Sequence, residues 1–139
     1  MLRLVQQNNP LHSDALNAVV LLKKKGEVLC IIPQNLIEFW AVATRPINSN
    51  GLGLSIEQAL QETEKLKNIF VLYPDTPAIF SEWERLVIKH EVMGKQVHDA
   101  RLVAAMLSHK ITQLLTFNID DFKRFSEIVT IDPRNVVSS

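Results

Sequence analysis

The sequence predicts an α/β domain with a mainly parallel sheet, and three observations support this fold class. First, apolar runs of the length and composition of buried strands occur at Val28–Ile32, Ile69–Leu72, Gln113–Phe117 and Ile128–Ile131. Second, helical periodicity fills the segments between most of them, as βαβ units require. Third, 139 residues with 47% hydrophobic side chains are enough for one core. We therefore expect a single domain over residues 1–139.

The first half of the chain divides at its glycine and proline residues. A helix is predicted over Ser13–Lys25, with Gly26 placed to end it. After the strand at Val28–Ile32, a second helix is expected over Asn35–Thr44. The following segment, Arg45–Leu54, is rich in Pro, Asn and Gly and is predicted to be a loop.

The second half contains three further helical patterns. Ser55 and Gln58 have the spacing of a capping box, which predicts a helix from Ser55 to about Asn68. Thr76 followed by Pro77 predicts a helix start, with the helix extending to about Val92. A third helix is expected over Val97–His109, and a short helical turn near Asp121–Phe125.

Overall charge and cysteine content exclude little. The formal net charge is zero, so no global electrostatic feature indicates a nucleic-acid partner, although a local site remains compatible with one. The single cysteine, Cys30, lies in an apolar run and fits a reducing cytoplasm. No apolar run has the length of a membrane span, and we expect no membrane partner.

Acidic residues are expected to gather at one edge of the sheet. Glu38 is placed in the first turn of the helix after the first strand, and Asp99 in the first turn of the helix before the strand Gln113–Phe117. Asp121, with Asp120 beside it, follows the end of that strand. The carboxyl ends of parallel strands share one edge. Clustered carboxylates repel unless a cation neutralises them, and oxygen-only ligands suit Mg²⁺ or Mn²⁺.

Each acidic residue alone has a simpler explanation. An acidic side chain in a first helical turn favours the helix dipole by roughly 0.3–1 kcal/mol, and for Glu38 or Asp99 alone we favour that reading. Asp120 and Asp121 could likewise cap the turn into Phe122. The coincidence of three such positions at one edge favours a metal site.

Two C-terminal segments, VHDARLVAAM and LLTFNIDDF, resemble the C-terminal half of PIN-domain nucleases, in particular VapC-type toxins of bacterial toxin–antitoxin pairs. IIPQNLIEFWAVATRP is similar to the second acidic motif of that family, and LRLVQQNNPLHSDAL to the region just after the first. The resemblance implies a three-layer α/β/α fold around a five-stranded parallel sheet. It also implies a Mg²⁺- or Mn²⁺-dependent endoribonuclease that forms a homodimer and binds a cognate antitoxin protein.

Position by position, the resemblance implies roles for four residues of a catalytic site. Glu38, Asp99 and Asp121 match acidic residues that hold the metal in the family. Asn118 stands where many members have a fourth aspartate, and Thr116 fits the hydroxyl residue usually found before that position. Because the Asn118 amide carries no charge, we expect weaker metal binding there than from a carboxylate.

The chain departs from the family at its beginning. The family starts with a central hydrophobic strand that ends in Asp-Thr-Asn, whereas Met1–Leu4 corresponds to residues just beyond that element. We therefore expect the central strand and its aspartate to be missing. Each lost inter-strand hydrogen bond costs roughly 0.5–1.5 kcal/mol, against a total stability of about 5–15 kcal/mol. The chain alone is then expected to be unstable.

Two alternatives to an active nuclease stay open. One is a catalytically inactive relative that still binds antitoxin or RNA. The other is an unrelated doubly wound binding module of receiver type, which would also gather acids at the sheet edge.

Among basic residues, Arg101, Lys123 and Arg124 are the candidates for contacts with RNA phosphates, because they lie near the acidic positions in sequence. Lys23, Lys24 and Lys25 are better explained as a solvated helix end.

Overall fold

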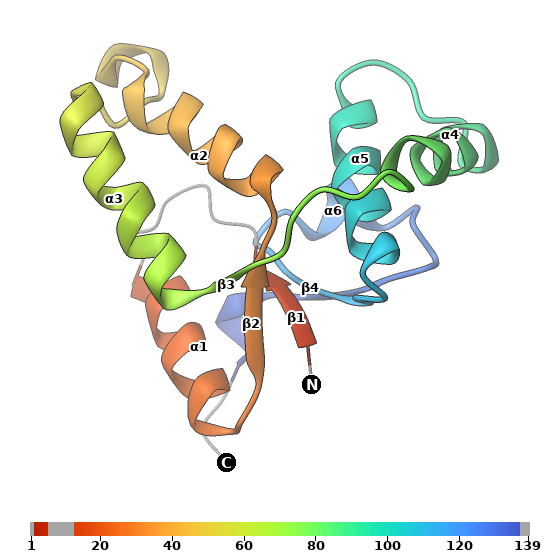
Figure 1. The fold of residues 1–139 in the computed structure, drawn as a ribbon, viewed down its shortest axis with the longest axis horizontal. Helices are drawn as coiled ribbons and strands as arrows, with labels where there is room; N and C mark the ends of the chain where they lie inside the picture. Colours follow the sequence, from red (N-terminus) through yellow and green to blue (C-terminus); the bar gives the residue numbers. More distant parts are fainter. Residues whose placement is uncertain (1, 6–12, 137–139) are drawn as a thin grey trace.

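The computed structural model describes residues 2–5 and 13–136 and contains one five-stranded parallel sheet (Figure 1). The strand order is β3-β2-β1-β4-β5, and every neighbouring pair is parallel. The strands are β1 Leu2–Val5, β2 Val28–Ile31, β3 Val71–Leu72, β4 Gln113–Leu115 and β5 Val129–Ile131. The predicted parallel α/β class is confirmed. The order differs from the 2-1-3-4-5 arrangement of receiver-type modules, which argues against that alternative.

Helices connect most of the strands, as parallel pairing requires. They are α1 Ser13–Lys24, α2 Pro33–Thr44, α3 Ile56–Ile69, α4 Ile79–Lys89, α5 Gln96–Ser108 and α6 Ile119–Phe122, with short 3₁₀ turns at Ile47–Ser49 and Pro133–Asn135. In the described part of the chain, no helix is long and apolar enough to cross a membrane.

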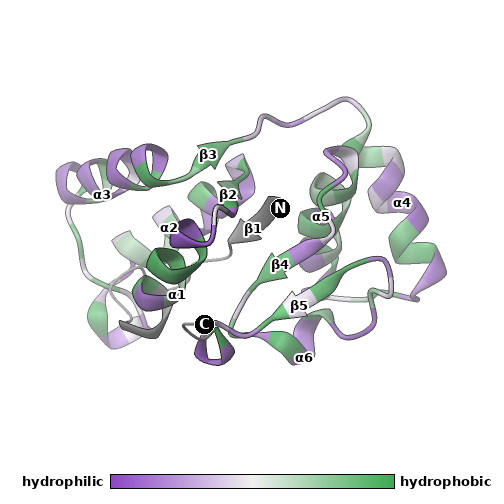
Figure 2. Ribbon diagram, turned by 90° about the horizontal axis from the view of Figure 1, so that it is seen from below, coloured by the Kyte–Doolittle hydropathy of each residue, from purple (hydrophilic) through white to green (hydrophobic). Residues whose placement is uncertain are grey.

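The core lies on both faces of the sheet. Side chains of a strand point alternately to opposite faces, and in β2 Leu29 packs with α1, α2 and α3, whereas its neighbour Cys30 packs with α4, α5 and α6. Figure 2 shows β3 and β4 as predominantly hydrophobic, while α3 and α4 carry many hydrophilic residues. The three-layer α/β/α arrangement is therefore confirmed. Burial raises the pKa of the Cys30 thiol to about 12, so this cysteine is an inert core residue.

The centre of the sheet is occupied, which corrects the expectation of a missing central strand. Leu2–Val5 pairs with β2 on one side, with Leu4 opposite Cys30, and with β4 on the other, with Val5 opposite Leu115. An apolar Leu-Arg-Leu-Val segment suits a strand that pairs on both sides. The chain was expected to be unstable because the central strand of the sheet was expected to be missing, and this reason no longer holds. Residues 6–12 contain no Asp or Glu and lie outside the described residues.

Three helix starts differ from the prediction, one of them that of α6, which begins at Ile119 where a turn near Asp121–Phe125 was expected. Helix α2 begins at Pro33 rather than Asn35, because the Asn35 side-chain oxygen accepts a hydrogen bond from the Ile32 amide (2.8 Å) and Pro33 suits the first helical position. Helix α4 begins at Ile79, and Thr76 does not cap it: its buried hydroxyl has no hydrogen-bond partner among the described residues. The capping box of Ser55 and Gln58 is confirmed by reciprocal bonds of 2.9 and 3.1 Å.

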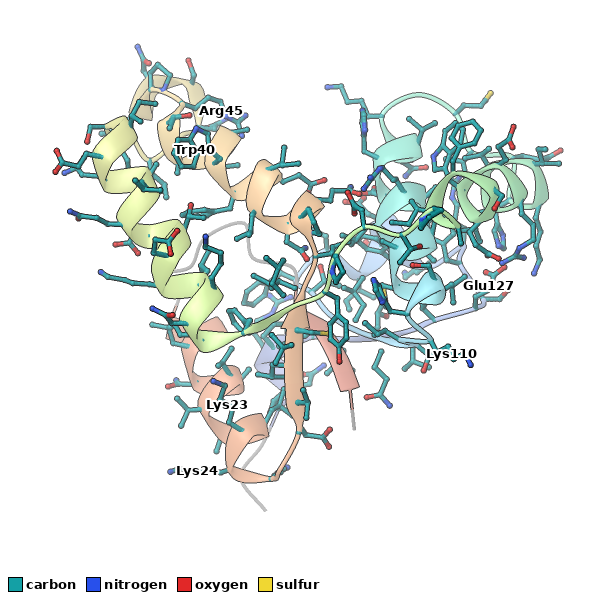
Figure 3. The ribbon with its side chains drawn as sticks, in the orientation of Figure 1. Lys23, Lys24, Trp40, Arg45, Lys110 and Glu127 are labelled. Carbon is teal, nitrogen blue, oxygen red and sulfur yellow. The ribbon has the colours of Figure 1, made fainter. Side chains whose placement is uncertain are left out.

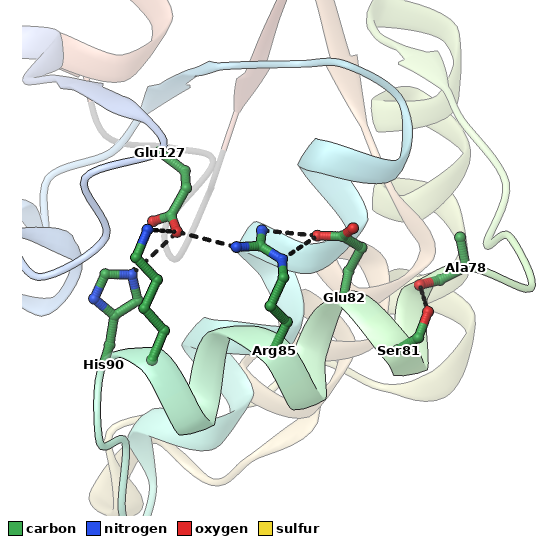
Figure 4. Close-up of polar contacts among 7 residues, drawn as sticks. Ala78, Ser81, Glu82, Arg85, His90 and Glu127 are labelled. Atoms are coloured by element: carbon green, nitrogen blue, oxygen red, sulfur yellow. Dashed lines mark hydrogen bonds and ion pairs between the residues drawn. The ribbon is translucent and has the colours of Figure 1, made fainter.

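An ion-pair cluster ties α4 to the segment before β5 (Figure 4). The largely buried Glu127 carboxylate accepts hydrogen bonds from Lys89 Nζ (2.9 Å) and His90 Nε2 (2.9 Å), and Arg85 lies 3.6 Å away. Burial opposes ionisation of Glu127, but the hydrogen bonds from Lys89 and His90 outweigh it and lower its pKa from 4.5 to about 2.

Because its folded-state pKa lies below its ordinary value, Glu127 stabilises the fold above about pH 4.5 and loses this contribution as the pH falls toward 2. We predict that Glu127→Gln lowers the free energy of unfolding at pH 7 by roughly 1–3 kcal/mol, and that the difference shrinks at pH 3. Urea denaturation at both pH values measures it. The exposed Glu64, paired with Lys67, supplies the control variant Glu64→Gln, expected to change stability by less than about 0.5 kcal/mol. Equal effects of the two variants at pH 7 would contradict the assignment.

Candidate functional site

One pocket brings together all four site residues expected from the sequence. It has a volume of about 870 Å³ and lies where α2, α5 and α6 meet beyond the carboxyl ends of β2 and β4. Its lining residues are Glu38, Ala41, Val42, Arg45, Asn50, Leu52, Lys95, Asp99, Asn118 and Asp121. The expected position at the carboxyl edge of a parallel sheet is thus observed.

Each acidic side chain comes from a different helix. Asp99 lies in the first turn of α5, as expected, and Asp121 lies within the short helix α6. Glu38 lies in the second turn of α2 rather than the first, because α2 begins two residues earlier than predicted. The helix-dipole explanation therefore does not apply to Glu38, since that effect is confined to the first turn.

The turn that carries Asn118 is fixed by a hydroxyl group. Thr116 is fully buried after β4, and its Oγ1 accepts a hydrogen bond from the Asn118 backbone amide at 3.0 Å. Asn118 occupies the N-cap position of α6, which places it at the pocket together with Asp121. A side-chain-to-backbone bond over two residues is a common way to hold such a turn.

The pKa of Asp99 reflects both its burial and its interaction with the other two carboxylates. Its pKa is raised from 3.8 to about 6, first by burial and then by the negative charges of Asp121 and Glu38. His98 and Arg124 act in the opposite direction but do not compensate. The pocket therefore carries excess negative charge around a partly buried carboxyl group.

The donor set suits a hard divalent cation, since it offers three carboxylates and the side-chain oxygen of Asn118. Within residues 2–5 and 13–136, however, no three His, Cys, Asp or Glu side chains are close enough to hold one metal ion directly. The carboxylates thus share a pocket without forming a closed set of direct ligands. Such an arrangement fits an ion that keeps part of its water shell, as Mg²⁺ does.

Gln34 was not anticipated from the sequence, although it contacts the acidic site. It lies one turn before Glu38 on α2 and only 7% of its surface is exposed. Its Nε2 donates hydrogen bonds to Glu38 Oε1 (2.9 Å) and to the backbone oxygen of His98 (2.7 Å). Its four-residue spacing from Glu38 was the available signal, because such residues share a helix face.

The basic residues around the pocket differ in part from those expected: the positive charge of Arg124 acts on Asp99, whereas Arg101 and Lys123 have other partners. Arg101 bonds to Gln34 (3.1 Å) and pairs with Asp75 (3.3 Å), and Lys123 pairs with Asp120 (2.7 Å). Arg45 and Lys95 instead line the pocket, from the end of α2 and the residue before α5. Lys23 and Lys24 lie far from Arg45, near the opposite end of the molecule (Figure 3), and Lys23 Nζ donates to the Ile69 backbone oxygen at 2.6 Å.

The predicted loop after α2 lines one side of the pocket and is held by backbone hydrogen bonds. The backbone amide of Leu52 bonds to the Val42 oxygen (3.0 Å), and that of Gly53 to the Arg45 oxygen (2.8 Å). A Cβ at Gly51 would overlap the Arg45 carbonyl group, so only glycine fits there. The backbone of Arg45 is thereby held at the pocket edge.

A second hollow, of about 460 Å³, lies between the first turns of α4 and α5 and is mainly apolar. Phe80 and Trp83 stack there with ring centroids 5.6 Å apart. No carboxylate lines it, so it offers none of the chemistry of the acidic pocket.

Comparison with known proteins gives a likeness of fold. No family model and no curated protein sequence matches the chain. Among solved structures, VapBC2 of Rickettsia felis bound to a promoter DNA fragment matches with a TM-score of 0.70 at 16% identity, covering 94% of this chain and 98% of that one. VapBC-1 of nontypeable Haemophilus influenzae gives 0.69 at 15% identity, covering 96% and 98%.

A third match is DNA-bound VapBC of Salmonella typhimurium, with a TM-score of 0.70 at 17% identity and coverage of 96% of this chain and 99% of that one. At such identities the likeness concerns the fold, and it extends over nearly the full length of both chains. The protein therefore has the PIN-like α/β fold found in VapBC toxin–antitoxin structures.

Proposed function

We propose that the protein is a divalent-metal-dependent endoribonuclease, the VapC-type toxin of a type II toxin–antitoxin pair, which hydrolyses RNA phosphodiester bonds at the acidic pocket. The observation that carries this proposal is the convergence of Glu38, Asp99 and Asp121 from three helices on one pocket, where burial and then the charges of Asp121 and Glu38 raise the pKa of Asp99. The fold shared with VapBC structures supports it.

Glu38, Asp99 and Asp121 would hold Mg²⁺ or Mn²⁺, directly or through water, and Asn118 would offer a neutral oxygen. A bound divalent ion supplies two things here: charge stabilisation on the phosphoryl oxygens and a more acidic water for in-line attack on phosphorus. Arg45 and Lys95 lie on the pocket lining, where their positive charges would bind the phosphates that flank the scissile bond.

The proposed partners are an RNA substrate, a cognate antitoxin protein and a second copy of the chain. The matched structures are VapBC complexes, two of them bound to DNA, which supports an antitoxin partner for this fold. With a single, buried cysteine, the protein is suited to the cytoplasm, where we propose that it acts.

A second candidate function is an inactive relative that binds antitoxin or RNA without cleaving. Three observations favour it: the neutral Asn118, the lack of Asp or Glu in residues 6–12, and the lack of a direct three-ligand set among the described residues. The first experiment below separates the two functions.

We predict that the purified chain cleaves generic single-stranded RNA when Mg²⁺ or Mn²⁺ is added, and that chelation with EDTA abolishes the reaction. Glu38→Gln and Asp121→Asn are each expected to lower the single-turnover rate at least about a hundredfold, because each removes one charge from the ion-binding set. Glu64→Gln, remote from the pocket, is the control and should leave the rate unchanged. RNA binding without cleavage under any of these conditions would favour the inactive relative.

Asp99→Asn tests, without substrate, the cost of a carboxylate that is partly buried and lies near Asp121 and Glu38. Because the pKa of Asp99 in the fold, about 6, exceeds its ordinary value of 3.8, the wild type loses stability as pH rises from about 4 to about 6. At pH 8 without divalent ions, the variant should therefore be more stable by roughly 1–2 kcal/mol, and near pH 4 the difference should vanish.

Addition of Mn²⁺ at pH 8 should raise the melting temperature of the wild type and have little effect on Asp99→Asn, since ligand binding stabilises only the protein that binds. Differential scanning fluorimetry measures both shifts. If the wild type is more stable than Asp99→Asn at pH 8 without metal, the charge of Asp99 is not unfavourable in the fold, which would contradict the prediction.

Asn118→Asp adds a carboxylate to the same pocket. We expect this variant to bind Mn²⁺ at least several-fold more tightly than the wild type, because a charged oxygen replaces a neutral one. Electron paramagnetic resonance of free Mn²⁺ gives the dissociation constant. Asn135, an exposed residue in the 3₁₀ turn near the C-terminus, provides the matched control Asn135→Asp, for which no change is expected. Equal affinities of Asn118→Asp and wild type would remove Asn118 from the site.

A further inference from the structure

We infer that Gln34 is a positioning residue of the acidic pocket: its buried carboxamide fixes one carboxylate oxygen of Glu38 and ties α2 to the start of α5. This inference rests on the proposed metal-dependent function and adds a residue to it. Three hydrogen bonds support it: the side chain of Gln34 donates two and accepts one, and only 7% of the residue is exposed.

The orientation of the Gln34 amide is determined by its neighbours. Its NH₂ group has two donor hydrogens, and these meet two groups that can only accept: Glu38 Oε1 and the backbone oxygen of His98. Its oxygen faces Arg101 Nη1 at 3.1 Å, a group that can only donate. Rotating the amide by 180° would set oxygen against two acceptors and NH₂ against the guanidinium. Only one orientation of Gln34 is therefore compatible with its surroundings.

The guanidinium that donates a hydrogen bond to Gln34 is itself part of an ion pair. Arg101 Nη2 pairs with Asp75 Oδ2 at 3.3 Å, in the connection between β3 and α4. The chain of contacts thus runs from Asp75 through Arg101 and Gln34 to Glu38, and its two inner members, Arg101 and Gln34, have a partner on both sides. Among the described residues, Gln34 is the one that donates a hydrogen bond to the Glu38 carboxylate.

The same amide also sets the separation of two elements that bear acidic groups. The His98 oxygen it binds belongs to the residue immediately before Asp99, so one glutamine contacts the Glu38 side chain and the backbone beside Asp99. Carboxylates that repel one another would otherwise move apart, and the bridge opposes that movement. Partners behind metal ligands typically change metal affinity or activity by 10–100-fold when removed.

Gln34→Met tests the role, since methionine keeps the length and volume of the side chain and removes its three hydrogen bonds. We expect Mn²⁺ to bind this variant about 10–100-fold more weakly than the wild type, measured by electron paramagnetic resonance of free Mn²⁺, with a comparable loss in single-turnover RNA cleavage. Gln113 supplies the matched control. It is a partly buried glutamine at the start of β4, away from the pocket lining, and Gln113→Met should leave Mn²⁺ affinity unchanged.

A double-mutant cycle separates positioning from general stability. If Gln34 acts in part through Glu38, then Gln34→Met should cause a smaller loss of Mn²⁺ affinity when Glu38→Gln is already present than it does in the wild type, whereas an independent effect would add in full. Urea denaturation of each variant checks that it folds. Wild-type Mn²⁺ affinity in a folded Gln34→Met overturns the inference and leaves the proposed function standing, as does full additivity in the cycle. A wild type that neither binds Mn²⁺ nor cleaves RNA overturns both.

Discussion

The main constraint on this structure is the repulsion among the carboxylates at one edge of its sheet, which the rest of the fold must offset. A parallel sheet with this strand order brings the ends of β2 and β4 to the same edge as the start of α5, so Glu38, Asp99 and Asp121 meet whatever their mutual charge. Burial, and then the charges of Asp121 and Glu38, raise the pKa of Asp99. Core packing on both faces of the sheet makes the cost tolerable, and a site that lowers stability in this way is typical of function rather than of structure.

The distribution of positive charge explains how such a pocket could accept a polyanion. The protein has no net charge, so long-range attraction contributes little, and the proposed RNA substrate would have to be held by contacts at the site itself. Arg45 and Lys95 line the pocket, whereas Arg101 and Lys123 are paired with Asp75 and Asp120. The closely hydrogen-bonded loop after α2 keeps the backbone of Arg45 in place, so this cation would act from a defined position.

Local signals in the sequence were sufficient for the fold class and for where the acidic residues gather, and they failed wherever a distant partner decides. The apolar runs predicted four strands, and the helix over Val97–His109 was predicted from its own residues, as was a helical turn after the strand Gln113–Phe117, although that turn was expected near Asp121–Phe125 and lies at Ile119–Phe122. The central strand was missed because Leu2–Val5 becomes a strand only through β2 and β4, which pair with it from both sides. The first turn of α2 was misplaced because one side-chain bond, from the Ile32 amide to Asn35, moves the start of the helix. The spacing of Gln34 from Glu38 was visible in the sequence, but its contacts with His98 and Arg101, and the place of Lys95 on the pocket lining, depend on residues distant in sequence.

Gln34 shows how a repulsive site can be ordered before any cation arrives. Carboxylates that repel one another gain by separating, and a loose Glu38 would have to be drawn back each time an ion binds. A buried amide with donors on one side and an acceptor on the other resists this movement, because any displacement breaks one of its hydrogen bonds. The link to Arg101 and Asp75 extends the restraint to the connection between β3 and α4. One carboxylate of the acidic pocket, that of Glu38, is thereby held by a neutral amide, and that amide is held in turn by the paired Arg101 and by the backbone beside Asp99.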